Sequence, residues 1–253
     1  INKSLAYIFD SIDKNPEYII IKVGQSLKFE KSYNSLVEEV INQKAIFKKN
    51  INLKFMLHSP STDNFERDCR ALEILKLHEI NINSISTNCL KIVKLYTQAF
   101  KLNEIQFAFN TIDGNKYFDL IRYCNKKKIK LMARSILSSG LLTSKGWSML
   151  DKKKDILRSK FWQNHENLLI LKERINSRNQ IYEFIHSSGN LINKSFEEIN
   201  FLLVGQISGI DKIVIGGSHF NHLKSNLKIC SSLDKKFVKQ FWNKFSNKTI
   251  PYI

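Results

Sequence analysis

The chain has 253 residues, 43% of them hydrophobic, which suits one α/β barrel or two smaller domains. Its longest apolar stretches fall far short of the ~20 residues that cross a bilayer, so we expect no membrane span. The formal net charge of +17 would favour polyanions, but the lysines are dispersed and no basic run alternates with aromatic residues, so we expect no nucleic-acid partner.

Short β-branched runs alternate along the chain with longer segments of helical hydrophobic spacing. This alternation is typical of parallel strands joined by crossover helices. The predicted strands are Tyr18–Val23, Asn52–His58, Asn83–Ser86, Ile105–Phe109, Lys130–Ala133 and Lys212–Ile215. The predicted helices are Ser32–Lys48, Asp63–His78, Leu90–Phe100, Lys116–Lys127, Phe196–Gln206, Asn221–Ile229 and Leu233–Phe245. Such a repeat predicts either an open doubly wound sheet or a closed barrel, and periodicity does not choose between them.

The segment Leu142–Leu171 departs from this rhythm and carries Trp147, Phe161 and Trp162 among many charges. In a barrel it would extend a loop over the face where active sites lie. The alternative is a surface helix with a few packed aromatic residues.

Two polar residues end predicted strands, which is where barrel enzymes place catalytic groups. Lys22 follows Tyr18–Ile21, and His58 ends the run Phe55–Leu57. A lysine there can lower the pKa of a neighbouring acid, and a neutral histidine can donate a hydrogen bond to a carbonyl. Taken singly, each residue type more often caps or packs a strand.

Further along the chain, Ser86 ends the third predicted strand, Asn88 follows it, and Gln106 lies within the fourth. A buried glutamine amide needs hydrogen-bond partners, and leaving it unpaired costs about 1–3 kcal/mol. A nicotinamide carboxamide would be one partner. A polar layer within a barrel core would satisfy it equally well.

Two turns suit a phosphate group. Arg134–Ser135 and Ser138–Gly140 follow the fifth strand, and Gly216–Ser218 follows the sixth, before a helix that begins near Asn221. Backbone N–H groups in such turns and at helix starts attract phosphate. Each turn could also be an ordinary connection between a strand and a helix.

Other common nucleotide-binding, catalytic and metal-binding motifs are missing from the sequence. No GxGxxG, GxxxxGKS/T or GxSxG motif is present, so a Rossmann fold would not hold a dinucleotide here. The cysteines Cys69, Cys89, Cys124 and Cys230 show no metal-ligand spacing, and we expect reduced thiols, no metal and a cytoplasmic location.

Six segments, taken in order, resemble strands three to eight of the aldo-keto reductase barrel. They are Ile19–Gly24, Leu57–Pro60, Ser84–Asn88, Ile105–Gln106, Ala133–Leu142, and Ile213–Gly216 with Leu223 and Asn226 in the helix beyond. The resemblance covers nearly the whole chain. It implies a TIM-type (β/α)8 barrel that binds NADPH or NADH and reduces the carbonyl of a small aldehyde or ketone by hydride transfer.

The resemblance also implies roles for single residues. Lys22 would lower the pKa of the proton donor, and His58 would orient the carbonyl. Gln106, with Ser86 or Asn88, would hold the carboxamide, and Arg134 would lie where many relatives place an aromatic ring against the nicotinamide. The remaining cofactor-binding residues are Ser135, Leu137 and Ser139 at the pyrophosphate, and Gly216, Ser218, His222 and Asn226 at the adenosine end. NADP-preferring relatives often carry a cation where this chain has Gly216–Ser218, so the choice of nucleotide stays open.

The start of the family's barrel is not found. The proton donor of the family is a Tyr supported by an Asp, just before a helix that Asn2–Asp10 resembles, and Tyr7 lies within that helix and is no substitute. We therefore expect residues 1–253 to be one N-terminally truncated barrel domain that lacks two β/α units and is by itself inactive. The alternative is a non-catalytic barrel of the same family that binds nucleotide or a protein partner, because the strand-five and strand-eight signatures are weak.

Overall fold

The structure, a computed structural model, describes residues 18–24, 32–47, 52–144, 165–188, 194–215 and 233–245. It forms two compact units, Ile1–Gln106 and Phe107–Ile253. Within the described ranges, no helix combines the length and the apolar character that a membrane crossing requires.

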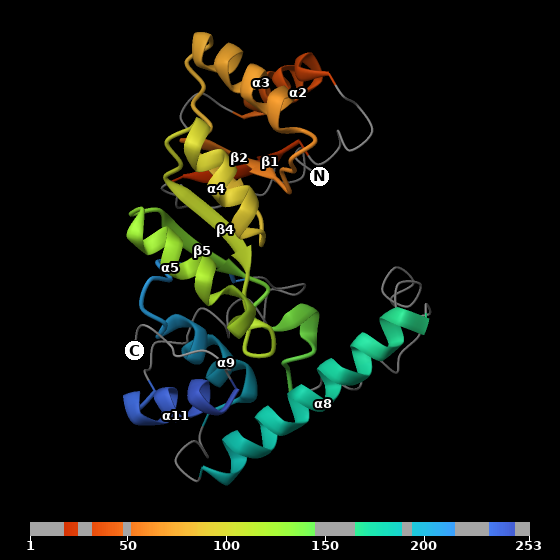
Figure 1. Cartoon of the computed structure of the whole chain (residues 1–253), viewed down its shortest axis with the longest axis vertical. Coiled ribbons are helices and arrows are strands. Elements are labelled where there is room, and N and C mark those ends of the chain that lie inside the picture. Colours follow the sequence, from red (N-terminus) through yellow and green to blue (C-terminus); the bar gives the residue numbers. More distant parts are fainter. Residues whose placement is uncertain are drawn as a thin grey trace. The chain divides into compact units, whose positions relative to one another are not determined.

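The first unit alternates strands and helices, as the sequence predicts (Figure 1). Its elements are β1 (Ile19–Val23), α2 (Tyr33–Ile46), β2 (Leu53–His58), α3 (Phe65–Leu77), β3 (Ser84–Ser86), α4 (Leu90–Ala99) and β4 (Glu104–Ala108), whose last residues belong to the second unit. Neighbouring strands pair in parallel, and one row across them is Val23, Leu57, Ile85 and Ile105. All four are at most 2% exposed, so this row forms the centre of the unit's core.

The helices of the first unit form because apolar side chains recur along one face. In α2 the buried residues are Leu36, Val37 and Val40, and the Ser32 hydroxyl accepts a hydrogen bond from the N–H of Asn34 at the start of the helix. Burying each such side chain stabilises the fold by about 1.5–3 kcal/mol.

Helix α3 and, in the second unit, helix α5 (Phe118–Lys126) end in the same way, with a non-glycine residue in the left-handed region. After α3, Glu79 has φ 58°, and the N–H of Ile80 reaches back to the carbonyl of Leu75 at 2.9 Å. After α5, Lys128 has φ 56°, and the N–H of Ile129 reaches the carbonyl of Cys124 at 2.9 Å. Glycine is usual at this position because it has no Cβ to clash with the backbone.

The second unit contains η2 (Gly114–Tyr117), α5 (Phe118–Lys126), β5 (Lys130–Arg134), η3 (Ser138–Gly140), α8 (His165–Ser187), α9 (Phe196–Gly205), β6 (Lys212–Ile213) and α11 (Lys235–Phe245). The six strands follow one another in the sheet in chain order. Strand β5 pairs in parallel with β6, with Ala133 opposite Ile213. Sequential parallel strands linked by helices are the arrangement of the predicted barrel.

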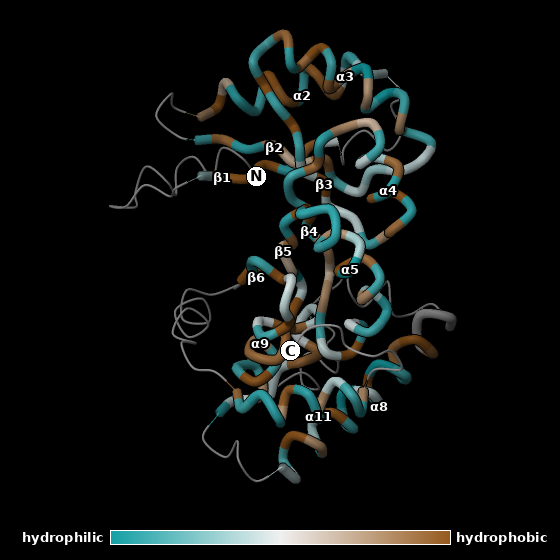
Figure 2. Tube along the Cα trace, turned by 60° about the vertical axis from the view of Figure 1, so that its left-hand side comes forward, coloured by the Kyte–Doolittle hydropathy of each residue, from teal (hydrophilic) through white to brown (hydrophobic). Residues whose placement is uncertain are grey.

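An aromatic cluster forms the core of the second unit. The rings of Phe109, Phe118 and Trp242 are fully buried, with centroids 5.8–6.2 Å apart. A Cβ on Gly114 would come within 2.7 Å of the Phe109 ring, so the cluster requires glycine there. In Figure 2, α9 is mainly brown, in keeping with burial on nearly all sides, whereas α11 alternates brown and teal.

The structure differs most from the sequence prediction in two helical regions, and β6 is also shorter than the predicted strand Lys212–Ile215. The predicted helix 116–127 is divided into η2 and α5, and the 23-residue helix α8 was not predicted. The segment Leu142–Leu171 is described up to Ser144 and again from His165, where α8 begins, so Trp147, Phe161 and Trp162 lie outside the described residues. The predicted helix Asn221–Ile229 also lies outside them.

Candidate active site

Three of the predicted site residues form a row across the first unit. His58 at the end of β2 is opposite Ser86 at the end of β3, and Ser86 is opposite Gln106 in β4. Residues in register on parallel strands project to the same face of the sheet. The strand ends therefore present an imidazole, a hydroxyl and an amide side by side.

Lys22 projects from the same face. It is opposite Met56, which precedes His58 by two residues, and side chains two apart in a strand share a face. The alternate residues, Val23 and Leu57, belong to the apolar row on the other face. The sheet of the first unit thus has one wholly apolar row and one polar face that carries both predicted catalytic residues.

The chain turns sharply after His58. Ser59 has φ 52°, a left-handed conformation that is uncommon for a residue other than glycine, and its N–H donates to the carbonyl of Ser86 at 2.9 Å. Pro60 follows and cannot continue the ladder as a donor. The strand therefore ends at His58 and leaves that side chain at the rim of the sheet.

The polar row is poorly solvated. Ser86 is 1% exposed and Gln106 is 6% exposed. The Ser86 hydroxyl has no hydrogen-bond partner among the residues that the structure describes. An unsatisfied buried hydroxyl costs about 1–3 kcal/mol, so a ligand that offers it a partner would recover that energy.

Asn88 lies two residues beyond β3, half-buried, in the short turn before α4. The turn is fixed by Thr87, whose side-chain oxygen accepts from the N–H of Cys89 at 3.2 Å. Of the two residues offered for the carboxamide, the structure brings Ser86 into the row with Gln106 and leaves Asn88 outside it.

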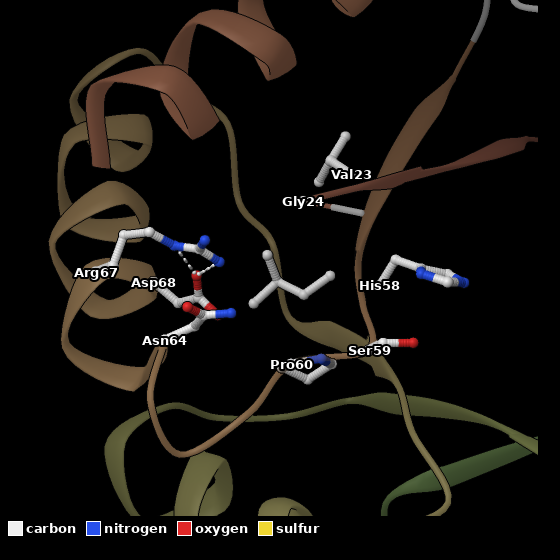
Figure 3. Close-up of a pocket in the computed structure, with 9 residues that line it drawn as sticks. Val23, Gly24, His58, Ser59, Pro60, Asn64, Arg67 and Asp68 are labelled. Carbon is white, nitrogen blue, oxygen red and sulfur yellow. Dashed lines mark hydrogen bonds and ion pairs between the residues drawn. The ribbon is translucent and has the colours of Figure 1, made fainter. Parts of the chain in front are cut away.

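A small pocket lies at the same strand ends but next to α3 (Figure 3). Asp68 is buried there and accepts hydrogen bonds from Arg67 and from the Tyr96 hydroxyl, the latter at 2.6 Å. Burial raises the pKa of the Asp68 carboxyl, although the hydrogen bonds of Tyr96 and Arg67 oppose this. In Figure 3 the His58 imidazole points away from this cluster, so we assign the pocket to the packing of α3 and not to the polar row.

The second unit carries the predicted pyrophosphate loop after β5. Ser135 and Ser139 are exposed and Leu137 is half-buried. Arg134, at the strand end, donates from Nη1 to the Ser135 hydroxyl at 3.3 Å. Its carbonyl accepts from the N–H of Phe109 at 3.0 Å. The loop therefore starts from a hydrogen bond to the end of β4.

Charged residues that were not predicted from the sequence surround this loop. Arg174 of α8 contacts Asp113 with Nη1 at 2.5 Å and donates from Nη2 to the Ser138 hydroxyl at 2.6 Å. Burial alone would raise the pKa of the Asp113 carboxyl, but Arg174 and Lys116 outweigh it, and the pKa is lowered. The only signal in the sequence is an Asn110 three residues before Asp113, which is typical of a capped turn and says nothing of the distant arginine.

The four residues predicted for the adenosine end, Gly216, Ser218, His222 and Asn226, lie outside the described residues. Among the described residues, no group of three or more His, Cys, Asp or Glu side chains is arranged to hold a metal ion.

Comparison with known proteins agrees with the resemblance seen in the motifs. A sequence profile of the Aldo/keto reductase family matches residues 55–245. None of the curated proteins compared with the chain matches it.

Solved structures of similar fold include the glycerol dehydrogenase from Gluconobacter oxydans, with a TM-score of 0.72, 16% identity, and coverage of 100% of this chain and 80% of that one. An aldo-keto reductase from Bacillus halodurans in its holo form gives a TM-score of 0.64 at 15% identity, covering 92% and 73% of the two chains. An aldo-keto reductase enzyme from a Medee basin deep-sea metagenome library gives 0.66 at 14% identity, covering 98% and 79%. At these identities the likeness concerns the fold.

Proposed function

Because this chain belongs to the aldo/keto reductase family, we propose that its protein reduces the carbonyl of a small aldehyde or ketone to an alcohol with NADPH or NADH. Family and fold support an oxidoreductase. We further propose that both units belong to one (β/α)8 barrel domain and that the protein works in the cytoplasm.

The observation that best supports the proposal is the polar face of the first unit. Lys22 and His58 project from it beside a buried amide and a buried hydroxyl, at the carboxyl ends of parallel strands. Active sites of barrels built from such strands lie at this end.

In the proposed reaction each of these residues has a separate role. The Lys22 ammonium would lower the pKa of a neighbouring proton donor, and the His58 imidazole would donate a hydrogen bond that orients the substrate carbonyl. Gln106 and Ser86 would hold the carboxamide of the nicotinamide, with Asn88 nearby. When bound, the dinucleotide supplies the hydride.

The other ligand contacts come from the second unit. Ser135, Leu137 and Ser139 would line the pyrophosphate, and Arg134 would lie at the nicotinamide. Gly216, Ser218, His222 and Asn226 would contact the adenosine end.

The test is a turnover assay on the product of the complete gene. We expect quenching of NADPH fluorescence on binding and loss of NADPH absorbance with at least one member of a panel of aldehydes and ketones. Binding without turnover across the panel would favour the alternative, a non-catalytic barrel of the same family. Absence of NADPH and NADH binding would refute the proposed reduction and would leave only a non-catalytic barrel that binds a protein partner.

A further inference from the structure

The loop after β5 adopts an unfavourable backbone conformation. Ser135, Ser138 and Ser139 have φ values of 60°, 48° and 58°, and only Gly140 among the left-handed residues of the loop is a glycine. A left-handed conformation costs a residue with a Cβ about 1 kcal/mol. Three such residues in one short loop need support from the surrounding structure.

Arg174 of α8 supplies part of that support. Its two terminal nitrogens are shared between Ser138, which lies in the loop, and Asp113, which follows β4. The side chains of Arg174 and Asp113 are 23% and 13% exposed, so solvent screens the contact only partly. A planar guanidinium suits this geometry because it presents two donors in a fixed fork.

Asp113 is itself held in place. Asn110 is buried, and its Oδ1 accepts from the N–H groups of Ile112 and Asp113, both at 3.0 Å. Asn110 directly follows Phe109, which is hydrogen-bonded to the end of β5. The segment after β4 and the loop after β5 are therefore linked at two places. Phe109 bonds to Arg134 at the end of β5, and Asp113 is linked through Arg174 to Ser138.

A second arginine of α8 fixes the far end of the loop. Arg178 is 5% exposed and donates from Nε to the carbonyl of Leu141 at 3.3 Å and from Nη2 to that of Thr143 at 3.2 Å. Since Arg174 and Arg178 are one turn apart on the same face of α8, the helix acts as a rigid support for the loop.

The serines of the loop differ in what they face. Ser138 is half-buried and bonded to Arg174, whereas Ser135 and Ser139 are exposed. Ser135 and Ser139 are therefore the serines of the loop that a ligand in solvent can reach. A diphosphate requires hydroxyl and N–H donors that are already oriented, because ordering them on binding would cost affinity.

We propose that Arg174 and Asp113 are positioning residues that hold this loop in the conformation that receives the diphosphate of a dinucleotide. The inference rests on the proposed function, in which the same loop lines the pyrophosphate. Arg174 acts through Ser138 and makes no contact of its own with the ligand.

The experiment compares two ligands in the product of the complete gene. NADPH carries the diphosphate, and adenosine 2′-monophosphate carries the adenosine end without it. We expect Arg174→Met to weaken NADPH binding about tenfold, as loss of loop positioning does, and to leave the affinity for adenosine 2′-monophosphate unchanged. Lys172→Met is the matched control, because Lys172 is an exposed cation on the same helix, and it should leave both affinities unchanged.

Two further variants separate positioning from loss of fold. Ser138→Ala removes only the hydroxyl that accepts from Arg174 and should weaken NADPH binding in the same direction, with little further loss when combined with Arg174→Met. Arg174→Lys should not restore binding, because one ammonium cannot reproduce the fork. Hydrogen exchange of the loop amides in the absence of ligand should be faster in Arg174→Met than in Lys172→Met.

The possible outcomes separate the role proposed for Arg174 from the proposed function of the protein. Wild-type protein that binds NADPH, together with an Arg174→Met variant of equal NADPH affinity, would overturn this inference and leave the proposed function standing. Equal weakening of both ligands would also overturn it. A wild-type protein that binds neither NADPH nor NADH would overturn the proposed function and this inference with it.

Discussion

Ser84 and Ser86 lie two residues apart on the same face of β3, both buried, yet only Ser84 has its hydroxyl satisfied: it donates to the carbonyl of Phe55 at 3.0 Å. The Ser86 hydroxyl has no partner in the part of the chain that the structure describes. The Ser84 hydroxyl is thus used for folding, and the Ser86 hydroxyl is left available to a ligand. Substitutions at the two serines can therefore be compared as a matched pair.

Replacing Ser86 by Ala should therefore affect binding and stability in different directions. We expect NADPH affinity to fall by about fivefold, the equivalent of one hydrogen bond, while the free energy of unfolding of the ligand-free protein stays the same or rises slightly. Ser84→Ala should instead lower the free energy of unfolding by about 1 kcal/mol and leave the affinity for NADPH unchanged. NADPH fluorescence titration and urea unfolding measure the two quantities. Equal affinity in wild type and Ser86→Ala would remove Ser86 from the cofactor site.

The proposed catalytic pair should separate chemistry from binding. Lys22→Met and His58→Gln should each lower kcat by about a hundredfold or more, the usual contribution of a group that acts in proton transfer. The Kd for NADPH should change little, because neither residue is assigned to the dinucleotide. Lys91→Met, at an exposed lysine of α4, is the control and should keep wild-type kcat. A normal kcat in Lys22→Met would assign that lysine a structural role.

The ion pair between Asp113 and Arg174 should make stability depend on pH in the acid range. Because the folded state lowers the pKa of Asp113 below its usual 3.8, the pair stabilises the fold fully above pH 3.8. Its contribution is lost as the pH falls from that value through the lower pKa of the folded state. Asp113→Asn should cost about 1–3 kcal/mol at pH 7, and the difference from wild type should shrink below pH 3.8.

Asp119→Asn provides the comparison for that measurement. Asp119 pairs with Arg122 at 3.0 Å, but both side chains are more than 40% exposed. Because solvent screens this pair, Asp119→Asn should change the free energy of unfolding by less than about 0.5 kcal/mol, both at pH 7 and below pH 3.8. A pH-independent cost for Asp113→Asn in urea unfolding would show that the lost stability comes from packing and not from charge.

The two helix ends predict stabilising substitutions. Glu79→Gly and Lys128→Gly each place glycine where the backbone is left-handed, and each should raise the free energy of unfolding by up to about 1 kcal/mol. Lys127→Gly is the control, since Lys127 has φ −89° and glycine there only adds freedom to the unfolded chain. In thermal unfolding, the midpoints of Glu79→Gly and Lys128→Gly should lie above that of wild type, and the midpoint of Lys127→Gly should lie below it.

The strands of the first unit could be predicted because each is a short run rich in apolar residues, and the runs of β2 and β3 end abruptly at His58 and Ser86. The alignment of His58, Ser86 and Gln106 in one row follows from the parallel pairing of these strands, which periodicity suggested without fixing the register. The identity of the family could be inferred from the order of six short motifs, and the family profile confirms it.

Helix α8 could not be predicted because only its second half buries apolar side chains, Ile181 and Ile185, while its first half has no apolar stripe. Arg174 and Arg178 contact the loop through hydrogen bonds, while Leu169 and Ile170 are about half exposed, so the hydrophobic period is weak. The ion pair that Arg174 forms with Asp113 joins residues far apart in the chain, and charge pairing at such a separation leaves no pattern in a single sequence. The sequence therefore predicted the strands of the candidate site but not the contacts of α8 that support its loop.

The row of polar strand ends also constrains how this chain tolerates insertions and deletions. Side chains alternate along a strand, so deleting one residue of β2 before Leu57 would turn His58 to the apolar side, opposite Ile85, and would bring Leu57 onto the polar face, opposite Lys22. Substitutions within the strands have no such effect on direction. Strand length and pairing offset are accordingly the properties of these strands that keep Lys22, His58, Ser86 and Gln106 on one face.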